Sequence, residues 1–89
     1  MAALTASVTT MATDLGTFAD TAALIVHNRG PVSVYIGGSA VTADETSTGG
    51  LEVVEGEKVG LPAKSGAGTA DLYAITAAGS STVTVFYRD

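Results

Sequence analysis

Residues 22–38 have the sequence AALIVHNRGPVSVYIGG. The run Ala22–His27 is rich in β-branched residues and predicts a buried strand. Asn28–Pro31 is a cluster of turn formers, in which glycine can adopt a positive φ and proline ends a ladder of hydrogen bonds. In Val32–Ile36 the aliphatic residues alternate with Ser33 and Tyr35, which predicts a second strand that ends at Gly37-Gly38. This stretch therefore predicts a strand, a turn and a strand.

The chain after residue 38 continues in the same way. Four further short runs flank two glycine-containing turns in pairs, namely Leu51–Val54 with Lys58–Leu61 and Asp71–Ala77 with Ser81–Tyr87. The polar segment Ser39–Gly50 has room for a short strand at Ala40–Thr42, and Pro62–Ala70 is a second loop. Short strands at a spacing of about ten residues are typical of antiparallel all-β domains. We therefore predict that residues 22–89 form a small β-sandwich or barrel of six or seven strands.

The first 21 residues allow two interpretations. Leu4, Ala6 and Val8 alternate with hydroxyl residues, which is the period of a strand. A longer set of apolar residues has the spacing of a helical stripe, and its members are Leu4, Val8, Met11, Leu15 and Phe18. The high threonine content favours the strand, because β-branched side chains lose rotamer freedom in a helix. We predict that residues 1–21 form an extended N-terminal arm or a first strand.

The composition is that of a small acidic domain. Leu, Ile, Val and Phe make up 21 of the 89 residues, enough for one thin core. Four Lys and Arg against nine Asp and Glu give a net charge of −5, which disfavours nucleic acid and anionic membranes as partners. The longest strongly apolar run, Ala22–Val26, is far shorter than the roughly 20 residues of a transmembrane helix. We therefore expect a soluble protein.

No sequence motif assembles a catalytic or metal-binding constellation. His27 is the only histidine, and no Gly-x-Ser-x-Gly motif accompanies it. The acidic concentrations Asp44-Glu45 and Glu52–Glu57 lack the alternating ligands of a calcium loop. The chain has no cysteine, and its paired glycines are not followed by a helix that would hold a phosphate. We therefore predict that the protein is not an enzyme and uses no metal or cofactor.

The tyrosines leave a question open. Tyr35, Tyr73 and Tyr87 lie on three separate predicted strands. Aromatic faces next to hydroxyl groups would suit stacking on a sugar ring. Cross-strand pairing within a sheet accounts better for three tyrosines on three strands, and it is the favoured interpretation.

Residues 28–42, NRGPVSVYIGGSAVT, resemble a motif of small structural proteins of tailed bacteriophages. These proteins carry Asn-x-Gly and, a few residues later, Val-Tyr-(Ile/Leu)-Gly-Gly-Ser-x-Val-Thr. The motif residues of the turn and the strand end are here Asn28, Gly30, Gly37 and Gly38. The resemblance extends over about Ala22–Tyr87 through Gly50-Leu51, Gly56-Glu57, Leu72–Ile75 and Thr82–Val85. The chain departs from the pattern at the charged Asp44-Glu45 and in the longer Pro62–Ala70 loop.

This resemblance implies a β-sandwich protein of the virion. The expected role is that of a capsid decoration, or cement, protein, which binds the outer surface of the major capsid protein lattice and stabilises the head. It implies a place on the capsid exterior, solubility in the host cytoplasm before assembly, and self-association, with a homotrimer as one form. The alternative is a tail or fibre component that binds a glycan of the host surface.

Under this hypothesis the N-terminal arm contacts the capsid or a sister subunit. The expected contact residues are the apolar side chains of the arm, Leu4, Val8, Met11, Leu15 and Phe18. The alternative is that these side chains complete the sheet of their own domain. The net charge of −5 further predicts a neutral or basic docking surface on the shell.

Overall fold

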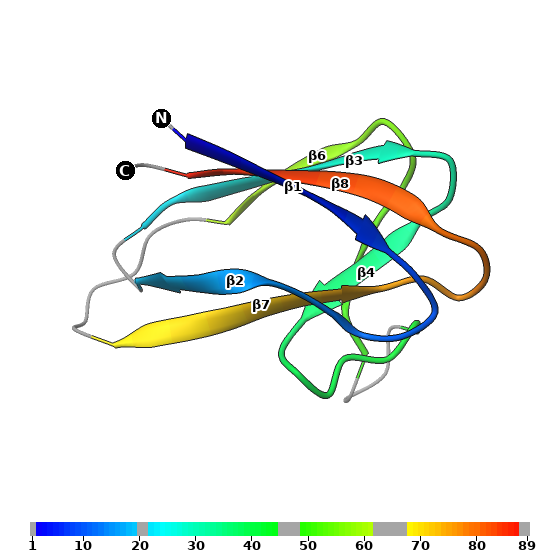
Figure 1. The fold of residues 1–89 in the computed structure, drawn as a ribbon, viewed down its shortest axis with the longest axis horizontal. Helices are drawn as coiled ribbons and strands as arrows, with labels where there is room; N and C mark the ends of the chain where they lie inside the picture. The colour runs from blue at the N-terminus through cyan, green and yellow to red at the C-terminus, as the bar shows by residue number, and fades with distance from the viewer. Residues whose placement is uncertain (1, 20–21, 45–48, 62–67, 88–89) are drawn as a thin grey trace.

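The structure, a computed structural model, describes residues 2–19, 22–44, 49–61 and 68–87. In these residues, eight strands form two antiparallel four-stranded sheets that pack on each other (Figure 1). Sheet A has the strand order β1-β8-β3-β6, and sheet B has the order β2-β7-β4-β5. The described part of the chain contains no helix long and apolar enough to cross a membrane.

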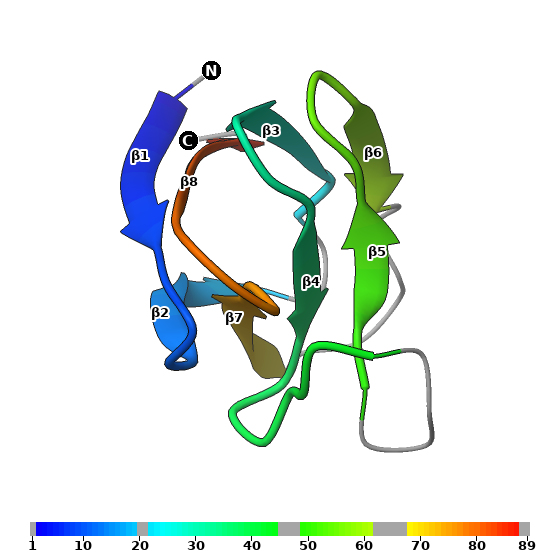
Figure 2. The same cartoon turned by 90° about the vertical axis from the view of Figure 1, so that its right-hand side faces the viewer.

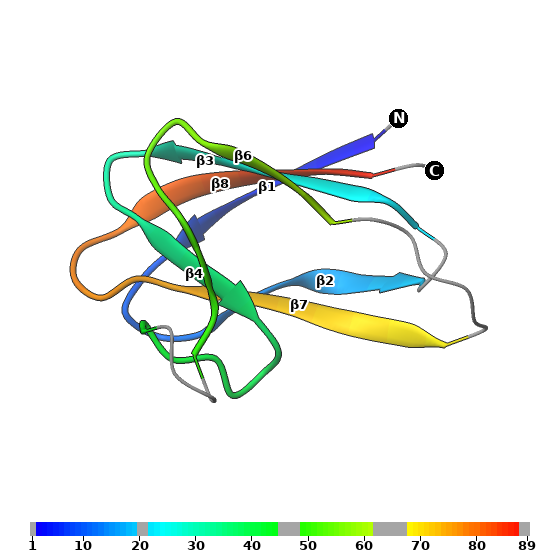
Figure 3. The same cartoon turned by 180° about the vertical axis from the view of Figure 1, so that it is seen from behind.

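Sheet A contains the first and last strands of the chain. Its strands are β1 (Ala2–Val8), β8 (Ser81–Tyr87), β3 (Leu24–Gly30) and β6 (Lys58–Leu61). β8 lies in the interior of the sheet, pairing with β1 from Ala2↔Tyr87 to Val8↔Ser81 and with β3 on its other side. β6 pairs with the outer side of β3, as Figure 3 shows from behind.

Sheet B contains the strands that follow β1, β3 and β6 along the chain. They are β2 (Thr13–Ala19), β7 (Thr69–Ile75), β4 (Val34–Gly37) and β5 (Leu51–Val53). The chain crosses between the sheets from β1 to β2 on one flank and from β5 to β6 on the other (Figure 2). The β2 ladder contains a register shift between Asp14 and Gly16.

The prediction of an all-β sandwich is confirmed, and the structure is not a closed barrel. The described part of residues 22–89 forms six strands, β3 to β8, which agrees with the predicted six or seven. Residues 2–19 add two more strands, one in each sheet, so the sandwich has eight in the described residues. The stretch Ala40–Thr42 forms no strand, although Thr42 makes an isolated bridge with Gly49. The helical spacing in residues 4–18 arises because the connection between β1 and β2 interrupts two alternating strands.

The core lies between the two sheets and is built from the inward positions of both. Strand alternation sends every second side chain inward, and the fully buried residues include Val8, Leu15, Val26, Val34, Val53, Val83 and Val85. Burial of one such aliphatic side chain contributes about 1.5–3 kcal/mol to folding. Two of these residues, Val8 and Leu15, come from the first two strands, so residues 2–19 are part of the domain core.

Asn28 is a buried polar residue that ties several elements together. Its side-chain amide donates hydrogen bonds to the carbonyl oxygens of Val32 and Val53, each at 2.8 Å. Its Oδ1 accepts the Gly30 N–H at 2.9 Å and lies 2.8 Å from the Ser81 hydroxyl. These bonds join β3 and β8 of sheet A to the segment before β4 and to the end of β5 in sheet B.

The main chain of Asn28 completes this network. Its N–H donates to the Glu57 carbonyl at 3.0 Å, and its carbonyl accepts the Gly56 N–H at 2.8 Å. The β5–β6 turn is thereby held against β3. Among the described residues, every buried side-chain nitrogen or oxygen has a hydrogen-bond partner, so the network is complete.

We expect Asn28→Ala to lower the free energy of unfolding by about 2–4 kcal/mol, because it removes the buried hydrogen bonds of the amide to the Val53 carbonyl and the Gly30 N–H and leaves the Val32 carbonyl only its bond from the Ser81 hydroxyl. Urea titration of the purified protein measures this loss. Thr82→Ala, at an exposed position of β8, is the control and should change stability by less than about 0.5 kcal/mol. Equal effects of the two substitutions would show that the network does not stabilise the fold.

Candidate interaction surfaces

The N-terminal residues predicted to contact a partner do not form one surface. Val8 and Leu15 are fully buried in the core and are not accessible in this structure. Phe18 is half-buried against Tyr87, with ring centroids 5.3 Å apart, and Leu4 is half-buried on the inner side of β1. Met11, in the connection between β1 and β2, is 76% exposed. Most of these side chains are covered because β1 and β2 are strands of the two sheets and turn them toward the core.

Two of the motif residues lie at the end of β3. The prediction of a turn from Asn28 is wrong there, because β3 continues through Asn28 to Gly30 in register with β8. Asn28 is the centre of the network described above, and Gly30 has a φ of +93°. A Cβ at position 30 would lie 2.6 Å from Glu55 Oε2, so the Glu55 side chain occupies the space beside this glycine. The Gly30–Pro31 peptide bond is cis. These motif residues therefore build the fold and are not free to bind a partner.

The other two motif glycines differ from each other. Gly37 ends β4, and a Cβ there would lie 3.0 Å from the side chain of Val41, which folds back and is itself buried. Gly50 also lies close to β4, where no side chain would fit, because a Cβ on it would lie 2.6 Å from the Ile36 carbonyl oxygen. Gly38 has open space around the Cβ position, and its carbonyl accepts the Val41 N–H at 3.0 Å. The Gly37-Gly38 pair thus allows the following loop to cover the end of β4.

The outer face of sheet A carries a row of apolar residues. Strand register places Ala3, Phe86, Ile25 and Gly60 side by side across all four strands. Ile25 is 40% exposed and Phe86 is half-buried. The next row along the strands consists of Thr5, Thr84, His27 and Lys58. The outer face of sheet A therefore has one apolar row across its four strands and, beside it, a second row of hydroxyl and basic groups.

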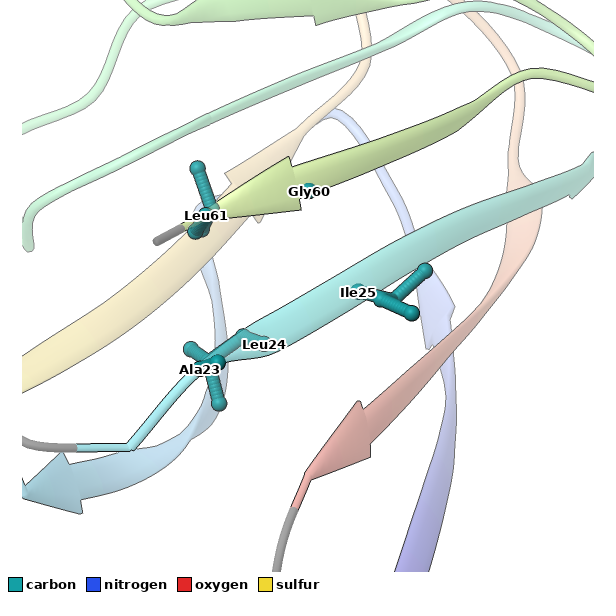
Figure 4. A pocket seen from close by; sticks show the side chains of 5 residues that line it. All are labelled: Ala23, Leu24, Ile25, Gly60 and Leu61. Carbon is teal, nitrogen blue, oxygen red and sulfur yellow. The ribbon is translucent and has the colours of Figure 1, made fainter. Parts of the chain in front are cut away.

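A shallow hollow of about 300 Å³ lies at the β6 end of this apolar row. It is lined by Ala23, Leu24, Ile25, Gly60 and Leu61, and Figure 4 shows them on β3, directly before it, and on the neighbouring strand β6. A Cβ on Gly60 would meet nothing within 4 Å, so the missing side chain leaves the flank of Ile25 open. The hollow is therefore open to solvent and has an apolar lining suited to an apolar side chain.

The charges divide between the two outer faces. On the described strands of sheet A, the outward positions carry His27, Arg29 and Lys58 and no carboxylate. On sheet B, the outward positions carry Asp14 on β2, Asp71 on β7 and Glu52 on β5. The acidic net charge is thus unevenly distributed, since the face with the apolar row is neutral to basic.

Two of the three tyrosines share the outer face of sheet B. Tyr35 pairs with Ile75, and Tyr73 pairs with Gly37, so the two rings stand on neighbouring strands in diagonal positions. The Tyr35 hydroxyl lies 3.4 Å from Glu52 Oε2. Tyr87 belongs to sheet A and packs against Phe18, away from the other two. The structure therefore brings two tyrosines together and separates the third.

The described residues hold no group of three or more His, Cys, Asp or Glu side chains placed to bind a metal ion. Asp44 accepts a hydrogen bond from the Thr42 hydroxyl at 3.0 Å, and Glu45 lies outside the described residues. His27 is half-buried between Thr84 and Lys58 in the register of sheet A.

Sequence patterns could not reveal the neutral-to-basic outer face of sheet A or the acidic outer face of sheet B, because the pairing of strands distant in the chain creates these faces.

We expect Gly30→Ala to destabilise the protein by about 1–3 kcal/mol, because alanine tolerates the positive φ poorly and its Cβ meets Glu55. Gly38→Ala is the matched control in the same motif and should cost less than about 0.5 kcal/mol, since its surroundings are open. Thermal unfolding compares the two variants. Adding Glu55→Ala to Gly30→Ala should restore part of the loss, and the absence of any such rescue would contradict the close contact.

Comparison with known proteins identifies no relative. The chain matches no protein-family model, no curated protein and no solved structure. The resemblance of residues 28–42 to small structural proteins of tailed phages therefore stays a prediction, and the function that it implies is a proposal.

Proposed function

We propose that the protein is a structural protein of a tailed-bacteriophage virion and acts as a capsid decoration protein, bound to the outer surface of the major capsid protein lattice. The sequence resemblance over about Ala22–Tyr87 supports this function. The observation that carries the docking mode is the apolar row on the outer face of sheet A, formed by Ala3, Phe86, Ile25 and Gly60.

The outer face of sheet A has the chemistry of a docking surface. Ile25 and Phe86 offer apolar area that a partner would remove from water, at a gain of about 25 cal/mol for each Å² buried. The hollow beside Gly60 accepts one apolar side chain of the shell.

This proposal moves the contact from the N-terminal arm to the sheet. Val8 and Leu15 are buried in the core and cannot reach a shell, whereas Ile25 and Phe86 lie on the outside of sheet A. The expectation of a neutral or basic docking surface on the shell, which came from the net charge of −5, changes as well. Because the outward positions of sheet A carry Arg29 and Lys58 and no carboxylate on its described strands, docking through this face does not need a basic shell.

The opposite face would then point into solvent. Asp14, Asp71 and Glu52 on the outer face of sheet B keep that side hydrated and repel other particles. Each copy clamps neighbouring capsid subunits with a modest contact. Repetition of that contact over the lattice gives a large total stabilisation of the head against the pressure of the packaged DNA.

Co-sedimentation with empty capsid shells tests this function. The wild-type protein should bind saturably, at a stoichiometry set by the lattice. Ile25→Glu, which places a charge in the apolar row, should weaken binding by about tenfold or more. Val54→Glu is the matched control, because Val54 is an apolar residue of the β5–β6 turn with a similar exposure of 46%.

The outcomes separate the function from the docking mode. Loss of binding in Ile25→Glu alone supports both. Unchanged binding of Ile25→Glu, with the protein folded, would keep the decoration role and exclude this face. Absence of saturable binding by the wild-type protein would exclude the decoration role itself.

A tail or fibre component that binds a host glycan is the second candidate, and one observation favours it. Tyr35 and Tyr73 stand on neighbouring strands of sheet B, beside carboxylates that can accept hydrogen bonds from sugar hydroxyls. A glycan array probed with the wild-type protein tests it. Tyr73→Ala should abolish any specific signal, whereas Thr69→Ala, at an exposed position of the same strand, should retain it.

A further inference from the structure

The four edges of the two described sheets differ in how they are protected. An unprotected sheet edge pairs with other chains, and natural proteins block such edges with charges, bulges or very short strands. β5 has three residues with Glu52 at its centre, and β6 has four residues and begins with the charged Lys58. β2 carries Asp14 next to the register shift between Asp14 and Gly16. Each of these three edges therefore has at least one recognised block.

The fourth edge, β1, has none of these features. Its seven residues, AALTASV, include no charged residue and no proline. It pairs with β8 in one continuous register from Ala2↔Tyr87 to Val8↔Ser81, so it is a long and regular strand. In the described residues, no strand pairs with its other side. β1 is thus the edge of this molecule best suited to accept another strand.

The sequence of β1 is complementary to itself when two copies run antiparallel about a two-fold axis through Thr5. In that register Ala2 faces Val8 and Leu4 faces Ala6 on the inner side, so apolar groups meet apolar groups. On the outer side, Ala3 faces Ser7 and Thr5 faces its own copy, so small side chains meet small side chains. No pair in this register is mismatched in polarity or in size.

We propose that a second copy of this chain occupies the β1 edge, and that the two β1 strands pair antiparallel about a two-fold axis at Thr5. Sheet A then continues from one protomer into the other. This inference goes beyond the proposed function and does not rest on it, because it concerns the protein in solution before any partner is present.

Charge and burial both favour a second copy as the occupant. Each chain has a net charge of −5, so two copies approach with least repulsion along a strand without charges. Leu4 and Ala6 lie on the inner side of β1 and are only half-buried in the single chain. The facing strand would cover these two side chains, which gives the pairing an apolar contribution besides the main-chain hydrogen bonds.

Substitutions at positions 3 and 7 test the register directly. Both side chains are exposed on the outer face of β1, and in the proposed register each faces the other across the axis. Ala3→Lys with Ser7→Lys places like charges opposite each other at two positions. Ala3→Lys with Ser7→Glu is the matched control. It changes the same two positions but places opposite charges opposite each other. Sedimentation equilibrium from micromolar to millimolar protein measures the dimer dissociation constant of each form.

The wild-type protein should show a reversible monomer–dimer equilibrium. The double-lysine variant should raise the dissociation constant about tenfold or more, and the lysine–glutamate variant should keep or lower it. Ala78→Lys with Ser80→Lys, in the exposed turn before β8, adds the same charge elsewhere and should leave it within about threefold. Circular dichroism and urea titration confirm that all variants are folded.

Three results would overturn the proposal. A wild-type protein that stays monomeric throughout this range shows that the β1 edge accepts no second copy, and leaves a strand of another protein as its occupant. A trimer shows a different symmetry. Loss of the dimer in both the double-lysine and the lysine–glutamate variants shows that residues 3 and 7 do not face each other across the axis.

Discussion

The two sheets depend on one buried amide. Asn28 extends from β3 to the Val53 carbonyl of β5 and to the Val32 carbonyl before β4, and it accepts the Gly30 N–H. An apolar residue at this position would fill the space but would remove all three of these hydrogen bonds, and a buried group left without a partner costs about 1–3 kcal/mol. The amide is suited to the position because it has two donors and one acceptor oxygen. The relative position of the two sheets at this end is therefore fixed by hydrogen bonds as well as by packing.

The packing of the two sheets explains the residue types at several positions of the motif in residues 28–42. Asn28 and Gly30 end β3 where the chain leaves sheet A, and the absence of a side chain at Gly37 lets Val41 pack against the end of β4. These residues are buried or covered, so they specify the sandwich and do not mark a binding site. The surfaces available for binding lie on the outward positions of the strands, where the sequence alternates without a motif.

Local patterns predicted the strands and the turns, but not what pairing brings together. The run Ser81–Tyr87 coincides with β8, and the run Val32–Ile36 overlaps β4, which begins at Val34 and includes Gly37. Residues 1–21 were ambiguous, because the 4 and 3 residue spacing of Leu4, Val8 and Met11 matches a helix as well as two interrupted strands. The apolar row could not be predicted, since Ala3, Ile25 and Phe86 become neighbours only through the pairing of β1, β8 and β3.

The proposed docking face and the proposed edge contact belong to the same sheet. Pairing at β1 would leave the outer face of sheet A on each protomer free, since the edge uses main-chain groups and the face uses side chains such as Ile25 and Phe86. Two docking faces held in one continuous sheet would bind a repeating lattice with a higher effective concentration than two separate copies, provided that their spacing matches the lattice. The uncharged β1 and the neutral-to-basic face also lie together, away from the carboxylates of sheet B. Segregation of charge to one face thus allows an acidic protein to associate through the other.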